Sequence, residues 1–324
     1  MPRTILSALL LAAAAFPQGE PQTSAGKPLF ALQSGFWVNL HHFLYVLGRA
    51  RDGAPDSQRA AVIKAPTDLD GFGALDERER KTWNDAVLFY QKGPSKQDLI
   101  FDADLAAITA AVAASGNASD LSGARVPTTL RDTLERAAAI YRKVWWIRHQ
   151  RANQARIAEL QDLLARYGKT VSAKLTAAYG EKWPNAGLVV QVSAYSNWAG
   201  AYSVVAGPIV ISSTDERTSG SLALETIFHE AMHQWDDDMI PRLNSAAAVS
   251  HVAIPRQLSH ALIFYTAGYV VSQVIPDHRP YAEAMWAPKG PLPGRPQLDA
   301  YWLPYLRGDG TLDHAIESLV TGFR

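Results

Sequence analysis

Two histidines four positions apart, with a glutamate directly after the first, stand in the stretch Ile227-Phe228-His229-Glu230-Ala231-Met232-His233-Gln234-Trp235. The surrounding positions are mostly apolar, which predicts a buried helix from about Gly220 to Asp237. Residues four apart lie on one helix face, one turn from each other, so both imidazoles can reach a single ion. The pattern therefore predicts that His229 and His233 bind a metal and that Glu230 lies beside it.

The residue types of this pattern favour hydrolysis by a metal-activated water. The chain contains no cysteine, which excludes disulfides and thiolate sites, so His, Asp or Glu must hold any metal. Histidine nitrogens are common ligands of Zn²⁺, and the ion makes a coordinated water more acidic. A neighbouring carboxylate can accept the proton of this water and pass it to the leaving group. We therefore predict Zn²⁺ as the cofactor and Glu230 as the general base.

The string from His229 to Trp235 resembles the H-E-x-x-H-Q-W signature of the aminopeptidase N-like gluzincins, within the wider zincin clan of metallopeptidases. The resemblance implies a zincin-like catalytic core, the zinc ligands His229 and His233, and Glu230 as general base. A gluzincin takes a glutamate 19 or 20 residues after the second histidine as its third ligand, whereas this chain has Val252 and Ala253 there. The G-x-M-E-N exopeptidase motif is also missing, so we expect an atypical member.

The third metal ligand must come from elsewhere, because a catalytic zinc normally has three protein ligands and one open position. No carboxylate occurs between Asp238 and Asp277. His260 lies in an otherwise apolar helix expected from about Pro255 to Val274, where a polar ring needs a strong partner. His251 lies in the connection before that helix. We favour His260 and keep His251 as the alternative; more remote candidates are Asp277, His278, Glu283, His41 and His42.

Further polar residues can support the metal or the transition state. Zinc histidines often donate their second ring N–H to a carboxylate, and Asp236, Asp237 and Glu225 lie one turn from the paired histidines. An ordinary structural role is an equal alternative for each. A phenol or imidazole must stabilise the oxyanion. We favour Tyr265, which shares the His260 helix; the alternatives by type are Tyr269, Tyr202 and His278.

The rest of the sequence predicts a mainly helical chain. Patterns over about 76–92, 103–115 and 127–180 predict helices, the last either continuous or broken near Gly168. A heavily buried helix is expected from Pro28 to about Arg49. Its adjacent His41 and His42 point in different directions, so we expect at least one to be an ordinary hydrogen-bonded histidine, while the other is free to approach the active site.

A short β-region precedes the active-site helix. Apolar and β-branched runs predict strands at 187–192, 202–205 and 208–212. We expect the strand at 208–212 to be an edge strand, the type to which zincins add an extended substrate by β-pairing. The fold class is therefore α+β, predominantly α-helical, with a zincin-like catalytic core and a small β-sheet before the active-site helix.

Composition and the N-terminus indicate an exported protein. Thirty-one basic residues balance 31 acidic ones among the 324 residues, which argues against nucleic acid or an anionic membrane as partner. Residues 1–25 resemble a signal peptide and leader, with an apolar run of about a dozen residues that is too short for a membrane span. We expect a bacterial periplasmic or extracellular protein. A helical region at 26–180 and the catalytic region at 181–324 should form one continuous body, because no linker composition separates them.

The leading functional hypothesis is a zinc metallopeptidase acting on a peptide or protein. Two alternatives remain: a non-catalytic envelope protein that binds peptide or metal with a zincin-like fold, and a hydrolase of non-peptide amides or esters. Glu230 favours catalysis, because metal binding alone does not require it. Substrate specificity, endo- or exo-action and oligomeric state are left open by the sequence.

Overall fold

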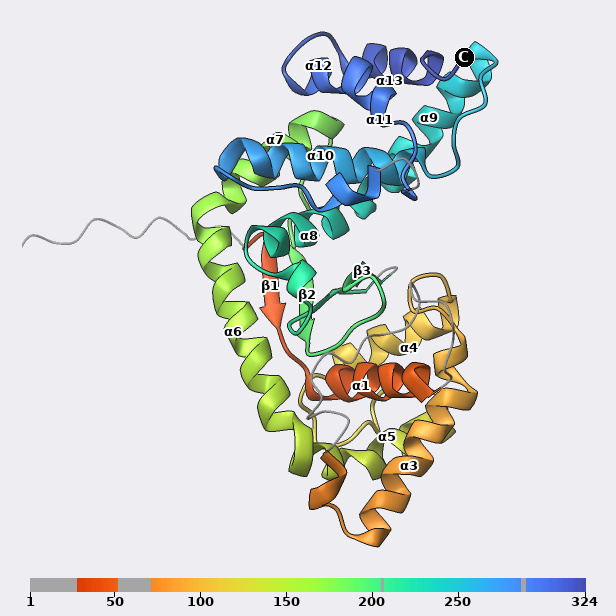
Figure 1. Ribbon diagram of the computed structural model, residues 1–324, viewed down its shortest axis with the longest axis vertical. Coiled ribbons are helices and arrows are strands. Elements are labelled where there is room, and N and C mark those ends of the chain that lie inside the picture. The colour runs from red at the N-terminus through yellow and green to blue at the C-terminus, as the bar shows by residue number, and fades with distance from the viewer. Residues whose placement is uncertain (1–27, 52–70, 205–206, 287–289) are drawn as a thin grey trace, which may run out of the picture.

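The fold is α+β and predominantly helical, as predicted, with one small mixed sheet (Figure 1). The computed structural model describes residues 28–51, 71–204, 207–286 and 290–324. The expected signal peptide and leader lie outside these residues. Within the described ranges, none of the helices combines the length and the apolar composition that a membrane crossing requires.

The sheet has four strands in the order β1-β2-β4-β3. Its strands are β1 (Phe30–Gln33), β2 (Leu188–Ser193), β3 (Ala201–Ser203) and β4 (Ile209–Ser212). β1, β2 and β4 are parallel, and β3 pairs antiparallel with β4. Two predictions were wrong: the helix expected from Pro28 begins only at Phe36, after a strand, and β4 is an inner strand. The edge next to it is β3.

The sheet separates two hydrophobic cores, because successive side chains of a strand point to opposite faces. On one face, Ile209 and Ile211 of β4 belong to the core that contains Phe228 of the active-site helix. On the other face, Val210 and Tyr202 belong to the core built by the first helices of the chain. The sheet thus lies between the upper and lower groups of helices in Figure 1.

Four helices form the lower group in the part of the chain that the structure describes. They are α1 (Phe36–Arg51), α3 (Glu77–Lys92), α4 (Ala103–Ala114) and α5 (Thr128–Tyr141). α3 starts with a capping box, in which Asp76 and Glu79 each accept a hydrogen bond from the backbone N–H of the other. Short 3₁₀ turns lie at Gly71–Ala74 and Pro94–Lys96.

The segment predicted to be one long helix or two helices broken near Gly168 is helical throughout, with two π-helical turns. After α5, its parts are Arg142–Trp146 (π), α6 (Ile147–Leu163), Leu164–Gly168 (π) and α7 (Lys169–Tyr179). A π turn inserts a residue into the helical ladder and allows a bend. α6 runs along one side of the molecule and joins the lower helices to the upper ones (Figure 1).

The upper group carries the predicted active-site helix. A 3₁₀ turn at Glu216–Thr218 leads into α8 (Ser221–Met232), and a second at His233–Trp235 leads directly into α9 (Asp236–Ser250). The helical path therefore continues well beyond Asp237. Next come α10 (Leu258–Val274), a 3₁₀ turn (Tyr281–Trp286), α11 (Arg295–Gln297), a π turn (Leu298–Trp302), α12 (Leu303–Leu306) and α13 (Leu312–Thr321).

Candidate metal centre

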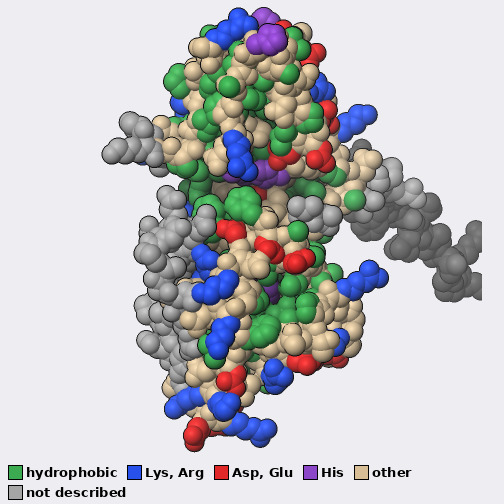
Figure 2. Space-filling model, turned by 90° about the vertical axis from the view of Figure 1, so that its right-hand side faces the viewer, with side chains coloured by type: hydrophobic (Ala, Val, Ile, Leu, Met, Phe, Trp, Pro, Cys, Tyr) green, Lys and Arg blue, Asp and Glu red, His purple; other side chains and the backbone are tan. Residues whose placement is uncertain are grey.

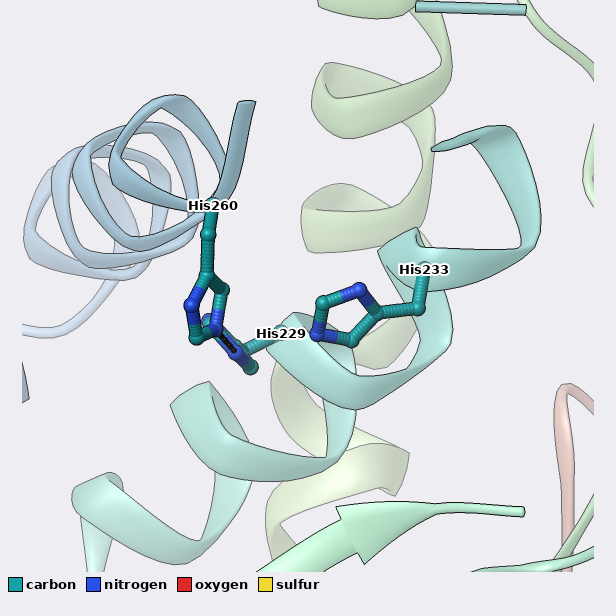
Figure 3. Close-up of side chains that lie close together, drawn as sticks. All are labelled: His229, His233 and His260. Atoms are coloured by element: carbon teal, nitrogen blue, oxygen red, sulfur yellow. Dashed lines mark hydrogen bonds between the residues drawn. The ribbon is translucent and has the colours of Figure 1, made fainter. Parts of the chain in front are cut away.

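Three histidines from two helices converge at one point (Figure 3). His229 lies near the end of α8, His233 in the 3₁₀ turn that follows, and His260 in the first turn of α10. Their ring centres form a nearly equilateral triangle with sides of 5.2, 5.2 and 5.3 Å. One nitrogen of each ring lies within 4.8 Å of those of the other two. The geometry thus brings together the three residues that the sequence suggested as ligands.

The donor set fits a zinc ion. Nε2 of His229 and Nε2 of His260 are 3.3 Å apart, so these two nitrogens face a common point. Three imidazoles with a fourth position left open form a typical catalytic zinc set. Burial lowers the pKa of His229 well below its ordinary value and that of His260 to about 4, so both rings are neutral at pH 7. The neutral ring is the form that binds a metal.

Asp236 orients the third ring. Nδ1 of His233 lies 2.7 Å from Oδ2 of Asp236, one helical turn further along the chain. A carboxylate only accepts, so Nδ1 carries the proton and Nε2 is left as the free acceptor. The pKa of His233 is raised: burial lowers it, but the bond to Asp236 and the charge of Glu230 outweigh that effect. Asp237, the other candidate for this role, is exposed.

The aromatic ring of Phe264, which no sequence pattern indicated, covers one side of the triangle. The ring of Phe264 lies 4.0 Å from the ring of His229 and 4.7 Å from that of His260, centre to centre. Tyr281 stacks on the far side of Phe264 at 6.0 Å. His229 is almost fully buried, and its Nδ1 has no hydrogen-bond partner in the described part of the chain. The ring of His229 is therefore shielded from water.

Glu230 lies beside the triangle and is held by the edge strand. Oγ of Ser203 in β3 donates to Oε2 of Glu230 at 2.7 Å and lies equally close to the backbone oxygen of the same residue. Burial raises the pKa of Glu230, partly opposed by the charge of His233 and the bonds from Ser203. No sequence pattern marked Ser203, because its distance from Glu230 along the chain is 27 residues.

The structure places two other candidates away from the triangle. His251 is exposed at the end of α9, in a left-handed conformation with φ of 53°. The hydroxyl of Tyr265 donates to Asp299 at 2.7 Å, and the Arg295 guanidinium lies 5.2 Å from the centre of its ring. The hydroxyl of Tyr265 thus already has a partner in Asp299, and its role as the oxyanion donor stays a prediction.

Glu225 and His278 form a buried pair with each other. Nε2 of His278 lies 2.7 Å from Oε2 of Glu225, and Nδ1 of His278 lies 2.7 Å from Oγ of Ser221. The backbone N–H of Tyr281 also donates to Glu225. This cluster fastens the segment after α10 to α8, and it leaves neither ring nitrogen of His278 for a metal or an oxyanion.

His41 and His42 are both ordinary hydrogen-bonded histidines, and both lie in the lower core. His41 Nδ1 lies 2.8 Å from the hydroxyl of Tyr90, and His42 Nε2 lies 2.7 Å from that of Tyr202. His42 Nδ1 donates to the carbonyl of Val38 at 2.7 Å. The prediction that at least one of them has this role is confirmed. Tyr202 is occupied by His42 and is buried on the sheet face opposite to α8.

The surface near the sheet is recessed. Figure 2 shows histidine side chains in a hollow that crosses the molecule below its upper part. No family model, no curated protein and no solved structure matches the chain.

Proposed function

We propose that this protein is an exported zinc-dependent metallohydrolase of the zincin type whose substrate is a peptide or protein. The observation that carries the proposal is the triangle of three imidazoles, completed by His260, with a carboxylate on the residue after His229. When bound, Zn²⁺ would supply a Lewis acid and a water of lowered pKa. Metal binding alone needs the triangle but not Glu230, which favours catalysis over simple binding.

The side chains divide the work of such a reaction. His229, His233 and His260 would hold the ion through one ring nitrogen each, and Asp236 keeps a proton of His233 on Nδ1. Glu230 accepts a proton from the attacking water and later delivers it to the leaving amine. Partial burial raises the pKa of this carboxylate and makes it a stronger base than an exposed one.

The outer edge of β3, which pairs with no other strand in the described part of the chain, supports a peptide as the substrate. Two backbone hydrogen bonds join the ends of β3 to β4: the N–H of Ser212 donates to Gly200, and the N–H of Val204 donates to Pro208. The residues of β3 that bond to β4 therefore alternate with residues that do not. The N–H and C=O groups of Ala201 and Ser203 consequently point away from β4. Ala201 is buried, whereas Ser203 is partly exposed. An extended peptide can add to this edge by main-chain hydrogen bonds. Ser203 links this edge to the proposed base, because its hydroxyl donates to the carboxylate of Glu230.

Metal content and hydrolysis of a mixed peptide pool, measured on the same preparations, test the proposal. Wild type should bind about one Zn²⁺ per chain, and His229→Ala and His233→Ala should lose it, because each removes a direct bond to the ion. Glu230→Gln should keep the metal but lose about 100-fold or more in rate, since an amide cannot accept the proton. His314→Ala, a change of an exposed histidine in α13, is the matched control.

Three results would contradict the proposal. A wild-type protein that takes up no zinc at micromolar concentration removes the metal centre. Zinc binding without hydrolysis of peptides or simple esters leaves a binding protein. Full activity in Glu230→Gln assigns the general base to another residue.

A further inference from the structure

Ser203 connects the edge strand with the carboxylate of the active-site helix. Its Oγ lies 2.7 Å from Oε2 of Glu230 and 2.7 Å from the backbone oxygen of the same residue. One hydroxyl proton is thus shared between the side chain and the backbone of Glu230. The bond fixes the carboxylate relative to the helix that carries it.

The same residue is exposed to a substrate through its backbone. In an antiparallel pair, residues alternate between bonding to the partner strand and pointing away from it. Gly200 and Val204 bond to β4, and Tyr202 lies opposite Val210, so Ser203 occupies a position whose N–H and C=O face outward. Ser203 is only partly buried, as a residue that meets a substrate must be.

The bond also restrains the orientation of the carboxylate. Oε2 accepts a hydrogen bond from Ser203, which restricts rotation of the carboxylate about its last torsion. A carboxylate that rotates freely about its last torsion spends part of its time with neither oxygen directed at the reacting water, because that torsion is broad. General-base catalysis depends on hydrogen-bond reach to the proton that is removed.

We propose that Ser203 is a positioning residue that orients Glu230 through its side chain while its backbone pairs with the substrate. The inference rests on the proposed function, because it needs Glu230 as the base. A substrate paired with β3 would be hydrogen-bonded to the backbone of Ser203, whose side chain orients Glu230. Ser203 alone would thus fix the position of the scissile bond relative to the proton acceptor. Removal of the hydroxyl alone should therefore slow the chemical step and leave substrate binding intact.

The test compares Ser203→Ala, Ser203→Cys and Ser203→Thr with wild type, using kcat, KM, zinc content and a crystal structure of the zinc-loaded alanine variant. The alanine variant should lose about tenfold or more in kcat with KM within about twofold. Threonine should restore kcat, because it keeps a hydroxyl and suits a strand. Cysteine, a weaker donor, should lie between them. The crystal structure should show the Glu230 carboxylate in more than one orientation.

Ser212→Ala is the matched control, because the Ser212 hydroxyl bonds the backbone of Ala194, away from Glu230. Its kcat should equal that of wild type. A kcat of Ser203→Ala within about twofold of wild type, or an equal loss in the control, overturns the inference while the proposed function stands. If wild type hydrolyses nothing, the proposed function fails. In that case the crystal structure of the zinc-loaded Ser203→Ala variant tests the positioning role separately. A single, unchanged orientation of Glu230 in that variant would overturn it.

Discussion

At the scale of single residues, His260 and His251 differ in what surrounds them. His260 meets His229 across the space between α10 and α8, whereas His251 is exposed at a helix end. We expect His260→Ala to lower zinc affinity by orders of magnitude, because a direct bond to the ion is lost. His251→Ala should bind zinc like wild type, since an exposed histidine contributes at most about 1 kcal/mol through a hydrogen bond.

Competition with a chelator measures both affinities on the same scale. The two variants control for each other, because each removes one imidazole from the same region of the chain. Equal affinities in both variants would show that the third ligand comes from another residue, and the reverse ranking would assign it to His251.

Tyr265 and Phe264 show how position on one helix separates two neighbouring aromatic residues. Each residue turns a helix by about 100°, so Tyr265, five positions after His260, points about 140° away from it. Phe264, four positions after His260, lies on the same face and contacts His229. The sequence contained this distinction, because it follows from helix geometry alone.

At the scale of elements, the distance between α10 and α8 determines how far His260 lies from His229 and His233. Gly268 of α10 lies against α8 and the segment after α10: a Cβ there would lie 2.6 Å from Cβ of Pro280 and 3.2 Å from Oε1 of Glu225. We expect Gly268→Ala to lower the free energy of unfolding by about 1–3 kcal/mol through overpacking. Zinc affinity should fall too, because α10 must move and carries His260 with it.

Urea unfolding and zinc titration check this prediction. Gly123→Ala is the control, because a Cβ at this exposed glycine meets no atom within 4 Å. A gain in stability of about 1 kcal/mol in Gly268→Ala, the value expected from helix propensity alone, would show that the helices have room to spare.

The strands show which elements local patterns miss. β1 has only four residues, and its pattern of apolar residues continues into α1, so it was assigned to a helix. Its partner is β2, and the register pairs Phe30 with Leu188. Such a distant pairing leaves no trace in a short window. β4 was correctly predicted as a strand, but its inner place depends on β3 folding back beside it.

At the scale of the whole molecule, the lower core contains histidines that oppose folding in acid. Burial lowers the pKa of His42 to about 4, partly opposed by the carbonyl of Val38, and burial also lowers that of His41. An unfolded histidine has a pKa of about 6.5. Between these two pKa values, His42 is protonated in the unfolded chain but not in the folded protein. The free energy of unfolding therefore falls as pH falls.

Urea unfolding at pH 7, 6, 5 and 4 measures this loss. His42 alone should contribute about 3 kcal/mol between pH 7 and pH 4, since each pKa unit is worth about 1.4 kcal/mol. His42→Gln keeps an amide near Tyr202 and does not titrate, so its stability should depend less on pH. An identical pH dependence in wild type and variant would show that other groups dominate.

The sequence by itself determined the parts of the site that depend on one helix. The spacing of His229 and His233 fixes two donors on one face, because helical periodicity is a local property. The same periodicity predicted most helices. Only the tertiary structure decided the third donor, the support of Glu230 and the edge of the sheet. His260 is 31 residues from His229, and Ser203 is 27 residues from Glu230. Those contacts exist because α10 and β3 pack on α8, and packing depends on shape over the whole chain.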